Sequence, residues 1–356
     1  MPRYSVIIPV YNRPEEVGEL LQSLIQQTEK DFEVVVIEDG SAERCDDVCA
    51  RFAGSLDLHY HCKPNGGPGE ARNFGAGKAH GDYLLIVDSD VVLPENYIAN
   101  ITKDLQKDTV AFGGSDRSHP SFTPVQKAIS YAMTSFFTTG GIRGGKKKLD
   151  KFYPRSFNMG IRRDVYQQLG GFSKMRFGED IDFSYRICEA GYDPQLLPNA
   201  WVWHKRRTDF RRFFKQVYNS GIARISLGIR HPGTTKPVHW LPALFTTGVF
   251  SLLLLALLGT AMFLNPDRND PASAGHMTAA VGFALVELAL LPVVSYSLLI
   301  FFDSSIRNRS LRVGLLSIPA AFVQLTGYGL GFLHAFWKRR ILRQSEFTAF
   351  EHNFYQ

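Results

Sequence analysis

The chain has 356 residues, of which 45% are hydrophobic and 21% charged, and its formal net charge is +6. This length allows one large domain or two smaller ones, and the charge is so modest that its distribution matters more than its sum. The four cysteines form no C-x-x-C pair, which gives no support to a zinc site and favours free thiols in a reducing compartment.

The first half of the chain alternates strand-like and helix-like segments. It opens with Met-Pro-Arg-Tyr and no apolar signal-peptide segment, so we expect this part in the cytosol. Four apolar, β-rich runs have the length of buried strands: residues 5–10, 32–37, 56–61 and 83–87. Apolar residues at helical spacing from Val17 to Ile25 predict a helix with Asn12 as a candidate cap, and residues 69–79 predict another. This alternation implies right-handed crossovers and a mostly parallel, Rossmann-like sheet.

Asp88, Ser89 and Asp90 follow the apolar run 83–87, where a buried strand should end. Side chains alternate along a strand, so the two carboxylates of this D-x-D motif lie on one face. A divalent cation with open positions for a diphosphate would relieve their repulsion. A surface turn can produce the same motif by chance. Ligands of parallel sheets bind beyond the carboxyl ends of the strands, so Asp39, at another strand end, should share a crevice with Asp88.

A second acidic cluster, Glu179, Asp180 and Asp182, lies about ninety residues further on. A departing nucleoside diphosphate gains negative charge, which a metal on Asp90 and a cation such as Arg72 would stabilise. An attacking hydroxyl must lose its proton, and Asp180 is the expected base. One base opposite the leaving group implies inversion. The alternative for Glu179 and Asp182 is that they are charges favoured at a helix N-terminus.

The composition changes near residue 238. Residues 238–266 and 313–337 contain no Asp, Glu, Lys or Arg, and residues 277–302 contain only Glu287. Each stretch exceeds the roughly 20 residues that span a bilayer core. Three buried core helices in succession, the alternative, would be unusual after a soluble domain. We therefore expect three transmembrane helices, at about 241–264, 279–302 and 313–336.

A basic band lies just before these apolar stretches. Between Lys205 and Lys236 there are nine Lys or Arg residues and one acid, Asp209. The band could bind nucleic acid, but its position favours anionic lipid head groups, and we expect membrane lipids and no nucleic acid as partners. The expected organisation is a catalytic domain, a basic juxtamembrane segment, a membrane region and a tail, at residues 1–205, 206–237, 238–337 and 338–356.

Two rules, hydrophobic length and the positive-inside rule, disagree about the number of membrane crossings. With a cytosolic catalytic domain, three spans place the tail on the far side, although it carries Lys338, Arg339, Arg340 and Arg343. The positive-inside rule would keep such a tail in the cytosol. Two spans result if the glycine-rich third segment turns back or lies at the interface. We expect three, because 25 uncharged residues are costly to leave uninserted.

These motifs together resemble the family 2 glycosyltransferases, inverting enzymes with a GT-A fold, over roughly residues 4–220. The resemblance rests on six segments in order: 5–12, 38–41, 65–73, 88–90, 170–182 and His204. It implies nucleotide-sugar contacts from Pro9, Tyr11, Asn12, Asp39, Gly67, Arg72, Asp88 and Ser89. It implies metal ligation by Asp88, Asp90 and His204, and acceptor-side roles for Gly160, Glu179 and Asp182. Carboxylate ligands suit Mg²⁺ or Mn²⁺.

Plainer alternatives exist for several of these residues. Asp39 could close a turn with Gly40, Arg72 could lie on the surface of a helix, and His204 could lie at a membrane interface. The chain also departs from the processive polysaccharide synthases of the family, because Gln216 is not followed by the Arg-Trp of their Q-x-x-R-W motif. Addition of a single sugar is therefore expected.

The sequence thus predicts a GT-A domain followed by an all-α transmembrane region. We expect a metal-dependent inverting glycosyltransferase of the inner or plasma membrane, acting in cell-surface glycan assembly with its catalytic domain in the cytosol. The expected donor is a UDP-sugar and the expected acceptor is lipid-linked or a glycan. The basic, glycine-rich segment 140–148 is a candidate contact for a pyrophosphate head group. The alternatives are sugar transfer to polyprenyl phosphate, as in dolichyl-phosphate mannose synthase-like members, and a non-catalytic membrane scaffold.

Overall fold

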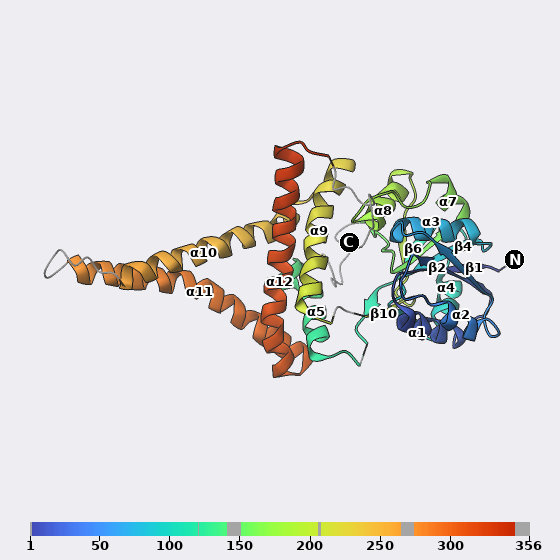
Figure 1. The fold of residues 1–356 in the computed structure, drawn as a ribbon, viewed down its shortest axis with the longest axis horizontal. Coiled ribbons are helices and arrows are strands. Elements are labelled where there is room, and N and C mark those ends of the chain that lie inside the picture. Colours follow the sequence, from blue (N-terminus) through green and yellow to red (C-terminus); the bar gives the residue numbers. More distant parts are fainter. Residues whose placement is uncertain (1, 120, 141–150, 206–207, 265–273, 346–356) are drawn as a thin grey trace.

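The computed structural model describes residues 2–119, 121–140, 151–205, 208–264 and 274–345. They form an N-terminal α/β domain followed by long helices, two of which extend far from the domain (Figure 1). The expected combination of an α/β domain with a C-terminal helical region is confirmed.

The α/β domain is built on a seven-stranded sheet of order β3-β2-β1-β4-β8-β6-β9. Its strands are β1 (Tyr4–Val10), β2 (Phe32–Asp39), β3 (Leu58–Lys63), β4 (Tyr83–Val87), β6 (Ala111–Gly113), β8 (Asn158–Arg162) and β9 (Gln195–Leu196). Only β8 runs antiparallel to its neighbours, β4 and β6. The expected mostly parallel sheet is confirmed.

Alternating residues of the central strands fill two apolar layers. In β1, Val6 and Ile8 face the first layer, whereas Ile7 faces the second. The first layer is covered by α1 (Pro14–Ile25), α2 (Asp46–Phe52) and α4 (Tyr97–Asp104). The second is covered by α3 (Pro68–Lys78), α7 (Arg163–Gln168) and α8 (Glu179–Glu189), on the other face of the sheet (Figure 1). A sheet covered on both faces requires nearly continuous apolar strands, as these are.

A second, three-stranded sheet lies beside the first. It has the order β5-β10-β7, formed by β5 (Val91–Val92), β10 (Val202–His204) and β7 (Asp116–Arg117). Because β5 begins directly after Asp90, this small sheet connects the D-x-D motif to residues more than a hundred positions later.

The helical region contains two arrangements of helices. The helices α10 (Leu241–Leu264) and α11 (Ala274–Asn308) run side by side away from the α/β domain, and α9 (Phe210–Arg230) and α12 (Leu311–Phe336) run across their base (Figure 1). Short helical turns, Pro237–Trp240 and Trp337–Ile341, precede α10 and follow α12. Among the described residues, three stretches are long and apolar enough to cross a membrane: Pro237–Leu264, Met277–Asn308 and Leu311–Ile341.

Two further helices come from the middle of the chain. They are α5 (Pro124–Thr134) and α6 (Phe136–Thr139), within the residues that the sequence assigned to the catalytic domain. Ala128, Ile129 and Ala132 of α5 share an apolar cluster with Phe213 of α9 and Ala320 of α12. This segment therefore joins the α/β domain to the helical region.

Candidate active site

Three neighbouring strands end at one edge of the large sheet, and polar residues of the predicted site follow each. Tyr11 and Asn12 follow β1, Asp39 ends β2 and Asp88 follows β4. Because β1 pairs in parallel with both β2 and β4, the carboxyl ends of the three strands lie together. This is the edge at which α/β sheets bind ligands.

Asn12 joins two of these loops. Its backbone is left-handed, with φ of 52°, and its side-chain oxygen accepts hydrogen bonds from the N–H groups of Ala42 and Glu43 at 2.8 and 3.0 Å. Its own N–H donates to Ser41 Oγ at 2.8 Å. The cap position of α1 is occupied by Arg13, so the expectation that Asn12 caps this helix is wrong.

Asp39 holds the loop that leads into α3. Lys63 Nζ donates to its Oδ1 at 2.7 Å, and the N–H groups of Gly66 and Gly67 donate to its two oxygens at 3.0 and 2.8 Å. Asn65 Nδ2 approaches Oδ2 at 3.3 Å. Both carboxylate oxygens are therefore occupied. Asp39 thus stabilises the conformation of the loop before α3. A nucleotide base that binds to Asp39 would have to displace one of these four hydrogen-bond donors.

The small sheet brings His204 to the D-x-D motif, because His204 on β10 lies opposite Val91 on β5. One ligand atom from each of Asp88, Asp90 and His204 lies within 4.8 Å of the other two. His204 Nε2 is 3.2 Å from Asp90 Oδ1, and Arg13 Nη1 is 2.5 Å from Asp90 Oδ2. Two carboxylates and one imidazole nitrogen form a donor set that fits a divalent ion such as Mn²⁺ or Mg²⁺.

Arg72 links the two acidic clusters. Its guanidinium lies 2.7 Å from Asp88 Oδ1 and 2.9 Å from Glu179 Oε1, and its side chain is only 4% exposed. Burial alone would lower the pKa of this guanidinium, but the two carboxylates outweigh burial and raise it. Arg72 is therefore a fixed positive charge inside the site, and the alternative of a surface residue does not hold.

Glu179 and Asp180 begin α8 and have different surroundings. Burial raises the pKa of Glu179, and the attraction of Arg72 does not cancel this effect. Burial also acts on Asp180, but Arg155, whose Nε lies 2.6 Å from Asp180 Oδ2, holds the pKa of Asp180 below its ordinary value. Asp180 is therefore ionised at neutral pH and able to accept a proton.

A cavity of about 1580 Å³ runs from these residues to the helical region. Its end at the α/β domain is lined by Tyr11, Arg13, Asp90, Arg155, Glu179 and Asp180. Its other end is lined by Leu241, Pro242, Phe245, Tyr296, Leu325 and Tyr328, from α10, α11 and α12. A smaller cavity of about 220 Å³ beside it is lined by Arg72, Asp88 and His204 and shares the acidic residues. The candidate site thus extends from the sheet edge to the base of the apolar helices.

Some predicted residues lie outside these cavities. Asp182 accepts hydrogen bonds from Ser173 and Arg186 at 2.8 and 3.0 Å, and it lies 3.0 Å from His231 at the end of α9. Gly160 lies in β8, where a Cβ atom would come 2.1 Å from the ring of Phe112. Asp182 therefore links α8 to Ser173 and His231, and the absence of a side chain at Gly160 leaves space for the ring of Phe112. Neither residue lines either cavity.

Pro9, Gly67 and Ser89 line neither of the two cavities. Pro9 lies opposite Ile37 in the pairing of β1 with β2, and Ser89 is buried between the two aspartates of the D-x-D motif. Gly67 has φ of 89° and directly precedes α3. Of the expected basic segment 140–148, only Gly140 belongs to the described residues, and it lines the large cavity.

The sequence missed two arginines of the site. Arg13 adjoins the first motif, so its position after Tyr11 and Asn12 was an available signal. Arg155 lies in no motif. It reaches Asp180 because the chain makes an isolated bridge between Arg155 and Asn158 just before β8, a contact without a local sequence signature.

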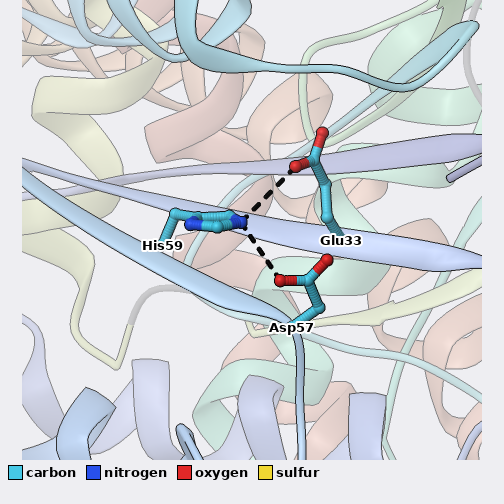
Figure 2. A group of neighbouring side chains, drawn as sticks. All are labelled: Glu33, Asp57 and His59. Atoms are coloured by element: carbon cyan, nitrogen blue, oxygen red, sulfur yellow. Dashed lines mark ion pairs between the residues drawn. The ribbon is translucent and has the colours of Figure 1, made fainter. Parts of the chain in front are cut away.

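A second group of histidine and carboxylate side chains lies elsewhere on the large sheet (Figure 2). His59 Nε2 is 3.1 Å from Asp57 Oδ1 and 3.6 Å from Glu33 Oε2. Glu33 is already held by Ser5 Oγ at 2.6 Å and by the N–H of His80 at 2.6 Å. These residues lie at the amino ends of β2 and β3, at the opposite edge from Asp39 and Asp88, so they form no part of the candidate site.

Comparison with known proteins identifies similar sequences. Residues 5–170 match the family model described as glycosyl transferase family 2. The chain is 26% identical to the pre-mycofactocin glycosyltransferase of Mycobacterium tuberculosis over 268 residues, 72% of this chain and 53% of that protein. It is 32% identical to an uncharacterized glycosyltransferase of Rickettsia felis over 142 residues, 39% of this chain and 23% of that protein. The chain thus spans about half or less of these relatives.

Among solved structures, the mannosyltransferase PcManGT from Pyrobaculum calidifontis, in complex with GDP-Man and Mn²⁺, is similar in fold. The TM-score is 0.51 at 20% sequence identity, over 91% of this chain and 87% of that one. A likeness at this identity concerns the fold alone, and it confirms the expected GT-A architecture.

Proposed function

Because residues 5–170 match the family model described as glycosyl transferase family 2, we propose that this protein is a membrane-anchored, inverting enzyme that moves one sugar from a nucleotide sugar to a lipid-linked acceptor. One observation carries the proposal: a single cavity joins the carboxylates of Asp90 and Asp180 to the base of the apolar helices. A donor bound at the sheet edge and an acceptor anchored in a bilayer could meet in this cavity.

The donor end fits a nucleoside diphosphate sugar, with UDP as our proposed base. Asp88, Asp90 and His204 would hold Mg²⁺ or Mn²⁺, which when bound neutralises charge on the departing diphosphate. Arg72 stands buried beside Asp88 and adds a fixed positive charge there. Arg13, now paired with Asp90, is a second cation in reach of the same position. Electrostatic stabilisation of the leaving group is thus the main task of this end.

The acceptor hydroxyl would attack from the side of Asp180. Its proton passes to the Asp180 carboxylate as its oxygen bonds to the anomeric carbon, while the bond from that carbon to the diphosphate oxygen breaks. Attack opposite the leaving group inverts the anomeric configuration. Arg155 Nε donates to Oδ2 of Asp180 at 2.6 Å and the N–H of Ile181 donates to Oδ1 at 2.9 Å, so the proton would bind to the remaining lone pair of Oδ1.

The far end of the cavity fits an apolar carrier. Leu241, Phe245 and Tyr296 line it, and Phe136 and Phe137 of α6 are exposed at its edge. A soluble acceptor would gain nothing from such a surface, whereas a lipid-linked acceptor would bury part of its chain there. We place the catalytic domain on the cytosolic side, where activated nucleotide sugars are made.

The test is product analysis with the purified full chain in lipid vesicles. A panel of radiolabelled UDP-, GDP- and dTDP-sugars is offered with a membrane lipid extract, and with bare polyprenyl phosphate in parallel. Label in extractable glycolipid only with the extract supports the proposal. Label on bare polyprenyl phosphate supports the alternative transferase, and no donor turnover with any sugar supports a non-catalytic scaffold.

A further inference from the structure

We propose that only α10 and α11 cross the membrane, and that α12 lies along the membrane surface on the same side as the catalytic domain. The partner of this surface is the head-group region of the bilayer. The inference rests on the arrangement of the helices and does not depend on the proposed chemistry.

The pair α10 and α11 has the properties of a transmembrane hairpin. Of the most apolar stretch of each helix, only 11% of the residues are buried. Large apolar side chains are exposed around both helices, among them Leu254, Leu257, Phe283, Leu291 and Phe302. A helix that is apolar all round and uncovered by protein requires lipid. The 24 residues of α10 measure about 36 Å, enough for a hydrocarbon core of about 30 Å.

The surroundings of α12 are different. In its most apolar stretch 44% of the residues are buried, because the helix runs across the base of the hairpin and packs against α9 (Figure 1). Two of the glycines of α12 serve the packing against α9. A Cβ on Gly331 would lie 2.0 Å from the backbone oxygen of Tyr218, and one on Gly327 would lie 2.6 Å from Val217. These two glycines, four residues apart, form one face of the helix against α9.

The attachment to α9 excludes α12 from the hydrocarbon core. Five charged residues are distributed along α9: Arg211, Arg212, Lys215, Arg224 and Arg230. Charged side chains at the centre of a bilayer are costly, so α9 must remain outside it. Tyr218 of α9 also holds His334 of α12, with Oη and Nδ1 2.6 Å apart. A helix packed in this way cannot enter the bilayer beside α10 without leaving α9.

Positive charges at both ends of α12 agree with this placement. Arg307, Arg309 and Arg312 lie at its beginning, and Lys338, Arg339, Arg340 and Arg343 lie at its end, with no charged residue between these groups. If α12 crossed the membrane, one group would lie on the far side. If α12 lies flat, both groups face the anionic head groups of one leaflet, as the positive-inside rule prefers.

Cysteine labelling in sealed membranes tests the inference. The native Cys62 is exposed on the catalytic domain and marks its side. Ser345→Cys marks the chain after α12, and Ser273→Cys marks the connection between α10 and α11. An impermeant maleimide is applied to intact cells and to inverted vesicles, and peptide mapping assigns the label to each position.

We expect position 345 to label together with Cys62, and position 273 to label from the opposite side. Labelling of position 345 together with 273 would mean three crossings and would overturn the inference. Labelling of all three positions from one side would show that the hairpin does not cross, which also contradicts it. A position 345 that reacts only after detergent is added would place the end of α12 inside the bilayer, again against the inference.

Discussion

At the scale of residues, the site is defined by how buried charges are paired. Arg72 stands between Asp88 and Glu179, Arg155 holds Asp180, and each pair brings together residues from separate elements. Removing one partner of such a pair leaves an uncompensated buried charge. Each substitution in the site is therefore compared with a control substitution elsewhere in the chain.

The first prediction concerns the base. Asp180→Asn should reduce kcat by roughly 10²–10⁴-fold, because the amide cannot accept the proton of the acceptor. The dissociation constant of the donor should change little. Asp182→Asn is the control variant, because Asp182 accepts a hydrogen bond from Ser173 and lies outside the cavity. The folded Asp182→Asn variant should keep the kcat of the unaltered protein. Near-normal kcat in Asp180→Asn would remove this assignment, and Glu179 would be the next residue to test.

The second prediction concerns pH. The pKa of Asp180 is held below its ordinary value by Arg155, so the ionised base persists above that pKa and is lost as pH falls through it. In Arg155→Met, the positive charge that lowers the pKa of Asp180 is absent, while burial still raises this pKa. The acidic limb of the kcat/KM profile should therefore move to higher pH. Arg162→Met removes an exposed arginine that pairs with Asp164, and its profile should match the unaltered protein. An unmoved limb in Arg155→Met would show that the limb reports another group.

The third prediction concerns the metal. Asp90→Ala should weaken UDP binding, measured by calorimetry, when Mn²⁺ or Mg²⁺ is present, and much less when the metal is chelated. Asp57→Ala is a matched control, because it removes a carboxylate from the distant group around His59 (Figure 2). Equal, metal-independent UDP binding by Asp90→Ala and the unaltered protein would contradict a metal role for Asp90.

At the scale of elements, patterns along the chain predicted the individual strands and helices better than they predicted which elements pack against one another. The apolar runs of β1, β2 and β4 and the spacing of α1 are local properties, and these elements lie where they were expected. The contact of His204 with Asp90 required β10 to pair with β5, two strands of two or three residues far apart in sequence. The family resemblance named His204, but no periodicity could place it. The sequence analysis predicted no helix at α5, and no local pattern shows that Ala128 and Ala132 pack in one cluster with Ala320 of α12.

The fourth prediction tests an element contact that the sequence did not reveal. Gly331→Ala places a methyl group 2.0 Å from the backbone oxygen of Tyr218, so α12 and α9 must separate. Overpacking of this kind costs about 1–3 kcal/mol, and we expect a lower midpoint of thermal unfolding in detergent. Gly248→Ala in α10 has no atom within 4 Å of the added carbon and should cause no loss. An equal midpoint for both variants would show that the α9–α12 contact is looser than described.

At the scale of the whole molecule, the large cavity connects parts that sequence reasoning treated separately. The sequence predicted a catalytic domain and a membrane region with a basic band between them. In the structure, α9 from this band and α5 and α6 from the catalytic segment enclose the space between the two. Aromatic residues are common in membrane helices, so nothing in the apolar stretches distinguished Phe245 or Tyr296 as cavity residues. Their role follows only from the packing of several helices.

The last prediction therefore tests whether the apolar end of the cavity binds the acceptor. Phe245 and Phe250 lie in the same helix, but Phe245 lines the cavity whereas Phe250 is 55% exposed on the outside of the hairpin. Phe245→Ala should raise the KM for a lipid-linked acceptor by about tenfold, equivalent to about 1.4 kcal/mol of lost contact. The KM for the donor should stay unchanged, because we propose that the donor binds at the other end. Phe250→Ala should change neither constant. If both variants raise the acceptor KM equally, the effect comes from the hairpin in the bilayer, and the acceptor does not occupy this end of the cavity.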